Sequence, residues 1–437
     1  MAKITKIENF FKIFGGYYKL SRSKRISILQ DYGVINADDC AMLTQDISEV
    51  FCSDADFLVE NSIGCFPLPL GIATNCVINE IPTLIPMATE ETSVIAALSG
   101  AGKWVNEHKG KIQTSQQGKG IRGQLYFREK SNFSAIITYF NLNKDALISD
   151  LNNRVVPSMK KRGGGVFSLE YRRIQDSSVA DEILVLDICM DCCEAMGANL
   201  ICQVSEALKS IISKDLGVAG DIAIVSNLSD CQTTTASLVI PSIDSDFAEK
   251  IVAANNVARA DIYRAVTHNK GILNGVDAVA LATGNDWRAI EASLHGYAAK
   301  GGYTPLTSWE FDGESLVGQL TAPFPAASLG GATTQKMVKV CHKILNLRSA
   351  QQLSGIFAAV GLLQNFAALK ALTTKGIVAG HMRLHINNLI LATDATSSES
   401  KRLKILLEER LCLLGKLTLT DSLELLHSLR LSEGQVR

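Results

Sequence analysis

Residues 261–289, DIYRAVTHNKGILNGVDAVALATGNDWRA, bring reactive polar groups next to buried apolar sequence. A turn is expected at Gly271, an apolar run follows over 276–282, and a second polar cluster, GNDWR, occupies 284–288. The first polar cluster consists of Arg264, His268, Asn269, Lys270 and Asn274. Burying such groups without partners costs several kcal/mol each. The stretch therefore predicts either a functional site or a well-capped turn whose charges are solvated.

Two motifs in this stretch resemble a known enzyme family. THNKGILNG, followed by ATGNDWRA, resembles the catalytic core of the class II, bacterial, 3-hydroxy-3-methylglutaryl-CoA (HMG-CoA) reductases. The resemblance extends over about residues 10–390, and several motifs keep the family's order. They are ENSIGCFPLPLGIATN at 60–75, PMATEETSVIAA at 86–97, EAMGAN at 194–199, SNLSD at 226–230, GGAT at 330–333 and GHMRLH at 380–385.

The composition of the chain indicates which kind of protein it is. A chain of 437 residues, 47% hydrophobic with net charge −1, predicts a globular protein of two or three domains without affinity for nucleic acid. Eleven scattered cysteines, without paired spacing, fit a reducing cytoplasm, and neither they nor His381 and His385 form a metal motif. The N-terminus lacks a signal peptide's apolar region, and the interrupted apolar stretch 356–372 predicts a buried helix instead of a membrane span.

The resemblance implies an α/β (α+β) fold. A large mixed substrate-binding domain is expected at 1–111 and 223–375, with an inserted, non-standard dinucleotide-binding domain at 112–222 and a C-terminal helical flap at 376–437. The first fifty residues predict short amphipathic helices. In the inserted domain, strands are expected near 122–128, 134–140, 166–172 and 183–190, and helices near 144–160 and 192–214.

Four catalytic residues follow from matching this chain to the family motifs. They are Glu91, Lys270, Asp286 and His381. Lys270 is expected to stabilise the negative carbonyl oxygen, and Glu91, kept protonated by apolar burial, to supply its proton. Asp286 is expected between them. His381, on a mobile flap, is expected to protonate the leaving thiolate. Taken alone, Glu90 and Glu91 could equally cap a helix.

Substrate contacts are also implied by the resemblance. The candidates are Ser93, Arg264, Asn274, Glu60 and Asn61. Arg264 and Asn274 are expected to hold the hydroxymethylglutaryl end, with Arg264 forming a fork to its carboxylate. The segment that contains Glu60 and Asn61 is expected near the acyl-CoA and the subunit interface.

The cofactor is expected to be NADPH or NADH. Candidate contacts are Glu194, Met196, Gly197, Asn199, Asn227, Lys160 and Arg162. NADH-preferring relatives carry an Asp near Val156; here that position is apolar and a basic run follows, which favours NADPH. A solvated basic turn is the alternative. Two departures from the family pattern are Glu194, where Asp is usual, and Lys336–Met337, where His-Pro is common.

The resulting hypothesis is a cytoplasmic HMG-CoA reductase that uses two NAD(P)H to form mevalonate and CoA, or that runs in reverse. No metal and no membrane partner are expected. The resemblance implies a homodimer with shared active sites, and leaves larger assemblies open. The alternatives are another NAD(P)-dependent oxidoreductase acting on an acyl-CoA or aldehyde, and a catalytically dead CoA-binding relative.

Overall fold

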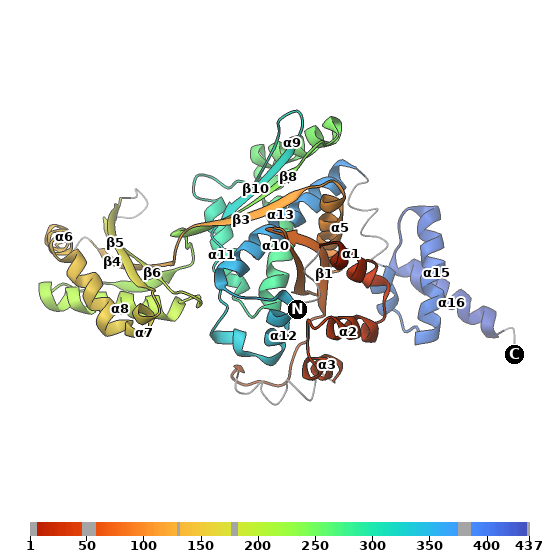
Figure 1. Cartoon of the computed structure of the whole chain (residues 1–437), viewed down its shortest axis with the longest axis horizontal. Coiled ribbons are helices and arrows are strands. Elements are labelled where there is room, and N and C mark those ends of the chain that lie inside the picture. Colours follow the sequence, from red (N-terminus) through yellow and green to blue (C-terminus); the bar gives the residue numbers. More distant parts are fainter. Residues whose placement is uncertain (1–6, 46–57, 129–131, 176–181, 375–385, 435–437) are drawn as a thin grey trace.

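The computed structural model describes residues 7–45, 58–128, 132–175, 182–374 and 386–434. These residues form a mixed α and β structure in three parts. A central body lies between a small sheet-and-helix unit at one end and a pair of C-terminal helices at the other (Figure 1). Each part has a hydrophobic cluster of its own, so each is built around a separate core.

The central body contains a four-stranded antiparallel sheet in the order β3-β8-β10-β9. The strands are β3 (Lys111–Gly118), β8 (Gln232–Ile240), β9 (Thr307–Phe311) and β10 (Leu316–Ala322). The helices that pack with this sheet into the largest core include α5 (Val94–Glu107), α9 (Ser245–Ala260), α10 (Ile262–Ala282) and α13 (Ala350–Thr373).

Helix α13 is long and apolar enough to cross a membrane, but 72% of its most apolar window is buried inside the protein. Even its polar residues are used internally, since Gln364 Nε2 donates to the carbonyl of Val94 at 2.9 Å. The expected buried helix is therefore confirmed, and it forms the axis of the central core (Figure 1).

Helix α10 is continuous through Gly271, so the turn expected there is wrong. Buried residues recur at the helical period on both sides of the glycine, including Ala265, Ile272, Val276 and Val279. A glycine in a helix costs about 1 kcal/mol relative to alanine. Packing of α10 against α13 outweighs that cost.

The N-terminal segment forms short helices, as expected. These are α1 (Ile7–Phe14), α2 (Arg22–Asp31) and α3 (Ala37–Thr44). They share a hydrophobic cluster with the hairpin of β1 (Leu70–Ile78) and β2 (Ile81–Ala88) and with α12 (Lys336–Leu345). Lys343 reinforces this contact through an ion pair of 2.7 Å with Asp39, whose carboxylate is buried.

The small unit is an antiparallel sheet in the order β5-β6-β4-β7. Its strands are β4 (Ile121–Arg128), β5 (Gly165–Ile174), β6 (Ile183–Asp191) and β7 (Ile222–Ser226). Helices α6 (Phe133–Asp150), α7 (Pro157–Lys161) and α8 (Ala198–Leu216) complete its core. Two connections join it to the central body, one between β3 and β4 and one between β7 and β8.

Two expectations for this unit are wrong. The strand expected over 134–140 is part of α6, because Asn132 caps the helix and the buried residues Phe133, Ile136 and Phe140 follow helical spacing. The helix expected from about 192 begins only at Ala198, after a turn that follows β6.

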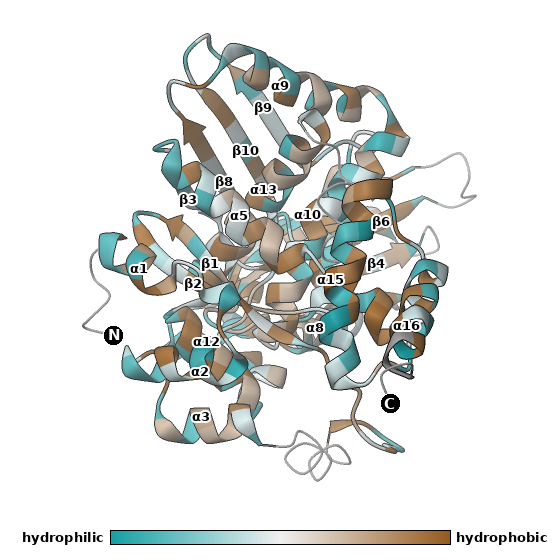
Figure 2. Cartoon of the chain, turned by 90° about the vertical axis from the view of Figure 1, so that its right-hand side faces the viewer, coloured by the Kyte–Doolittle hydropathy of each residue, from teal (hydrophilic) through white to brown (hydrophobic). Residues whose placement is uncertain are grey.

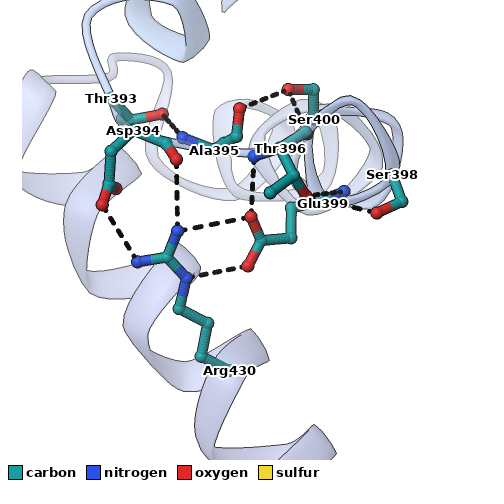
Figure 3. Close-up of polar contacts among 8 residues, drawn as sticks. All are labelled: Thr393, Asp394, Ala395, Thr396, Ser398, Glu399, Ser400 and Arg430. Atoms are coloured by element: carbon teal, nitrogen blue, oxygen red, sulfur yellow. Dashed lines mark hydrogen bonds and ion pairs between the residues drawn. The ribbon is translucent and has the colours of Figure 1, made fainter.

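The C-terminal part consists of α15 (Ser397–Leu414) and α16 (Leu419–Gly434). Arg430 of α16 donates to Glu399 at 2.7 Å and to the Asp394 carboxylate at 3.2 Å (Figure 3). The Arg430 hydrogen bond, together with the Thr396 backbone N–H, lowers the pKa of Glu399 to about 2. Apolar and polar residues alternate along both helices (Figure 2).

Candidate active site

The centre of the candidate site is an ion pair between two residues far apart in the sequence. Lys270 Nζ of α10 lies 3.3 Å from Glu91 Oε2, in the turn between β2 and α5. Their side chains are 63% and 43% exposed, respectively, so a ligand can reach both. The structure thus brings together two of the four predicted catalytic residues.

Glu91 does not cap a helix. Helix α5 begins at Val94, and Ser93 occupies the cap position with φ of 82° and no side-chain capping bond. The backbone N–H of Glu91 donates to Thr89 Oγ1 at 3.1 Å, which fixes the turn. The apolar burial expected for Glu91 is also absent from this single chain. Its carboxylate faces an ammonium group at a surface that a substrate could cover.

Lys270 shares one face of α10 with Asn274 and Asp277, at the spacing i, i+4 and i+7. Arg264 lies near the start of the same helix and is half-buried. The two predicted substrate-binding residues on α10, Arg264 and Asn274, are thus on the helix that carries Lys270. The helix supplies a rigid platform for all of them.

Asp277 was missed in the sequence because it lies inside a run that is otherwise apolar. One of its oxygens, Oδ1, is buried without a hydrogen-bond partner among the described residues. Burial, and then the neighbouring carboxyl of Glu291 on α11 (Trp287–Ala298), raise the pKa of Asp277 to about 8. Lys270 is near enough to oppose this shift through its charge. A buried acid that holds its proton at neutral pH is the signal that could have identified it.

Asp286 is the N-cap residue of α11. Its carboxylate caps α11, accepting from the backbone N–H groups of Arg288 and Ala289, and pairs with the Arg288 side chain at 3.2 Å. Among the described residues, no hydrogen bond or ion pair joins it to Lys270 or Glu91. Helix N-termini favour carboxylates, which explains this position.

The polar residues before Lys270 are structural. His268 Nε2 lies 2.6 Å from Thr307 Oγ1 and 2.9 Å from Asn365 Nδ2, while Asn269 bonds the backbone of Thr304 and Leu306. Burial, followed by the charge of Arg264, lowers the pKa of His268 to about 4. His268 is therefore a neutral core histidine at physiological pH.

The turn that contains GNDW is held against the GGAT segment. Asn285 exchanges two hydrogen bonds with the backbone of Ala327, at 3.1 and 2.7 Å. A side chain at Gly284, whose φ is +67°, would come within 2.9 Å of the Ala332 backbone. This close approach explains why glycine stands there. The departure at Lys336–Met337 marks the start of α12, and Met337 packs in the N-terminal cluster.

The small unit contacts the central body through Glu194. Its carboxylate accepts from the backbone N–H of Ala350, at the start of α13, at 2.7 Å and from the Ser328 hydroxyl. Its carbonyl accepts from the N–H groups of Ser328 and Leu329. The predicted cofactor residue Glu194 thus joins the small unit to the central body by hydrogen bonds in this structure.

The turn after Glu194 fits a phosphate group. Gly197 has φ of +87°, and a side chain there would lie 2.0 Å from Cys192 Sγ, so only glycine fits. It leads directly into α8, whose first turn has no side-chain cap. Uncapped N–H groups at a helix start, preceded by a glycine, are suited to an anion such as a dinucleotide phosphate. Met196 and Asn199 flank this turn.

The chain is similar to known proteins of one family. The sequence profile of the family described as Hydroxymethylglutaryl-coenzyme A reductase matches residues 21–386. The chain belongs to this family. It is 38% identical over 422 residues to 3-hydroxy-3-methylglutaryl-coenzyme A reductase of Archaeoglobus fulgidus, covering 95% of this chain and 94% of the relative. It is 35% identical to the probable enzyme of Borreliella burgdorferi, over 82% of this chain and 84% of that one.

Solved structures of the family give the same result. The class II reductase of Streptococcus pneumoniae matches with a TM-score of 0.79 and 36% identity, covering 95% of this chain and 99% of that one. A second structure of that enzyme, bound to NADPH in open conformations, matches with a TM-score of 0.78 and 36% identity, over 83% of this chain and all of that one. The predicted fold class and family are therefore confirmed.

The basic segment that contains Lys160 and Arg162 lies beside the turn that leads to α8. Cys193 Sγ lies 3.7 Å from the carbonyl of Arg162, and Lys160 donates to Asn153 Oδ1 at 2.8 Å. Val156, by contrast, is 2% exposed within the core of the small unit. Its side chain does not face the surface, so the argument for NADPH from this position does not hold. The argument from Lys160 and Arg162 stays a prediction. Asn227 is exposed in the connection from β7 to β8.

Glu60 and Asn61 of the reductase chain are exposed. Among the described residues, neither is joined to Glu91 or Lys270 by a hydrogen bond or ion pair. Their segment also exposes large apolar residues, with Ile63 and Phe66 at 106% and 92%. His381 lies outside the described residues. Within the described part of the chain, no group of three His, Cys, Asp or Glu side chains could hold a metal.

Proposed function

We propose that this member of the family reduces HMG-CoA to mevalonate and CoA, consuming two NADPH. The observation that carries the proposal is the accessible Lys270–Glu91 pair, held by a rigid helix and a fixed turn, at positions that match the family's motifs. The same site catalyses the reverse oxidation of mevalonate when product and oxidised cofactor are in excess.

Lys270 acts on the substrate carbonyl. Each of the two reductions places negative charge on that oxygen, and an ammonium donor aimed at developing charge is the strongest device available to an enzyme. Lys270 projects from the middle of α10, so its position is fixed by the packing of the helix. Bound NADPH would supply the hydrides.

Glu91 delivers the proton to the same oxygen. It is within hydrogen-bonding distance of Lys270, so one oxygen atom of the substrate can contact both groups. Covering the site with substrate removes water from the pair, so that the proton passes directly between the carboxyl and the substrate oxygen. Arg264 and Asn274 hold the acyl end from α10, and His381, by its motif, protonates the thiolate.

The cofactor binds the small unit at the start of α8. The uncapped helix turn after Gly197 takes the pyrophosphate, and Lys160 and Arg162, whose segment contacts the turn through Cys193, attract a 2′-phosphate. This arrangement favours NADPH over NADH. Glu194 positions the turn relative to the central body through its bonds to Ala350 and Ser328.

A second copy of the chain completes the site. Ile63 and Phe66 are almost fully exposed, and Tyr263 at the start of α10 is 83% exposed. Large exposed apolar residues next to a site are typical of an interface. Such a homodimer would bring Glu60 and Asn61 of one copy to the site of the other. Sedimentation of the wild-type chain should give a dimer, and Phe66→Ser with Tyr263→Ser should give a monomer without activity.

The direct test is oxidation of NADPH or NADH by the purified protein with HMG-CoA. We expect turnover with both cofactors and a larger kcat/KM with NADPH, and equal loss of that preference in Lys160→Ala and Arg162→Ala. Lys103→Ala is the matched control, because Lys103 forms an exposed ion pair of 3.6 Å with Glu107 on α5, outside the small unit. A folded dimer without turnover in either direction would overturn the proposal.

A further inference from the structure

Two cysteine thiols meet at the boundary between the small unit and the central body. Cys189 Sγ of β6 and Cys231 Sγ, in the connection from β7 to β8, are 2.6 Å apart. A disulfide bond measures about 2.05 Å between its sulfur atoms. Both residues are half-buried, so a small oxidant can reach them.

Cys231 lies where the two connections between the parts touch. Its carbonyl accepts from the backbone N–H of Lys119, in the other connection, at 3.1 Å. A side chain at Gly118 would lie 2.0 Å from that same carbonyl. Cys189, in contrast, lies within the sheet of the small unit, opposite Arg122 of β4. A bond between the two sulfurs would therefore tie that sheet to the two connections between the parts, which we call the hinge.

The surroundings favour a reactive thiolate at Cys231. The hydrogen bond from the Cys189 thiol lowers the pKa of Cys231, against the opposing effect of burial, and the charge of Arg122 acts in the same direction. The Arg122 guanidinium is held in place by Asp230 at 2.9 Å and Asp187 at 3.6 Å. An accessible thiolate next to a second thiol is the arrangement of redox-sensing cysteines.

Other cysteines in the described part of the chain lack this arrangement. Cys76 and Cys341 are buried, and burial raises the pKa of each to about 12. Cys65 and Cys412 are exposed. Among the described residues, Cys189 and Cys231 are the two cysteines whose sulfur atoms are in contact.

We propose that Cys189 and Cys231 form a reversible disulfide under peroxide, and that this bond locks the hinge of the small unit. The Cys231 thiolate attacks one peroxide oxygen, the O–O bond breaks, and hydroxide leaves. Cys189 gives its proton to that hydroxide and attacks the sulfenic sulfur; the S–O bond breaks and the leaving hydroxide takes up a proton. Two thiols and one peroxide thus yield one disulfide and two waters, and a dithiol reductant reverses the change.

The chemical step needs no substrate and is tested first. The full chain is treated with hydrogen peroxide and analysed by non-reducing peptide mass spectrometry. We expect a cross-linked pair containing Cys189 and Cys231, lost after dithiothreitol and absent from Cys189→Ser and Cys231→Ser. Cys202→Ser, a half-exposed cysteine of α8, is the matched control and should keep the cross-link. Free thiols at 189 and 231 under peroxide that oxidises exposed Cys412 would overturn the proposal.

The effect on turnover rests on the proposed function. Closure and opening of domains often limit turnover, so we expect oxidation to lower kcat at least about fivefold and dithiothreitol to restore it. The serine variants should keep their activity under the same treatment. Disulfide formation with unchanged kcat would refute the hinge lock. A reduced enzyme without any turnover would refute the proposed function and leave the disulfide result intact.

Discussion

Helix α10 has an inward face that packs in the core and an outward face that carries Lys270. The two faces have different roles, although their residues are neighbours in one short motif. His268 and Asn269 point into the core, where they bond Thr307, Asn365 and the backbone near residue 305. The next residue, Lys270, points outward to Glu91. A helix turns by about 100° per residue, so neighbours in sequence reach opposite environments. The motif therefore contains both the residues that anchor the helix, His268 and Asn269, and the reactive residue, Lys270.

The buried contacts of the inward face of α10 fix the position of the side chains on its outward face. Asn365 of α13 receives hydrogen bonds from Thr307 and from Trp309 and donates to His268, so α10, α13 and β9 are joined by one buried network. Side chains on rigid, packed elements are held more accurately than those on loops. Substitutions on the outward face should therefore lower activity, and substitutions on the inward face should lower the stability of the fold.

The largest expected effect is that of Lys270→Ala. Loss of the donor to the carbonyl oxygen should lower kcat/KM at least about 10³-fold. Stability should change by less than about 1 kcal/mol, because the pair with Glu91 is exposed. Initial rates and thermal unfolding measure both quantities, and Lys103→Ala should change neither. A large drop in Tm would mean that Lys270 stabilises the fold, and it would contradict the different roles of the two faces.

Glu91→Gln should follow, with a loss of about 10²- to 10⁴-fold in kcat, the range for general acid catalysis. The amide keeps the size of the side chain and its contact with Lys270, so the KM for HMG-CoA should change little. Rates across a range of pH should show that an acidic group of the wild type no longer titrates in the variant. An unaltered kcat would leave proton delivery to another group, with Asp277 as the next residue to test.

On the inward face, His268 predicts a loss of stability in acid. Its pKa is about 4 in the folded protein and about 6.5 in an unfolded chain, so below 6.5 the unfolded state binds the extra proton. Stability should fall by about 3 kcal/mol as the pH drops from 7 to 4. Urea unfolding of the wild type and of His268→Gln measures this. An equal acid dependence in both proteins would contradict the assignment.

The sequence was sufficient for the family and the fold class, because long motifs carry them. It failed where tertiary contacts overrule local signals. Gly271 looks like a turn, yet packing on α13 carries the helix through it. The coupling of Asp286 with Lys270 and Glu91 stays a prediction, and the structure adds that Asp286 caps the start of α11. Asp277 is hidden in an apolar run, and only burial next to Glu291 reveals its character.

The smallest expected effect belongs to Asp277, at the border of the two faces. Its pKa is about 8 in the folded protein, above the value of about 3.9 for an unfolded Asp. Between these values the folded state holds the extra proton, so the stability contributed by this group falls as the pH rises from about 4 to about 8 and levels off above that range. Asp277→Asn lacks this proton, so its Tm relative to that of the wild type should rise by a few degrees between pH 6 and pH 9. Asp246→Asn, in an exposed pair with Lys250, is the control, and its Tm relative to that of the wild type should stay constant over the same range. If the wild type and Asp277→Asn lose the same Tm between pH 6 and 9, Asp277 is already ionised at neutral pH and belongs with Lys270 on the charged face.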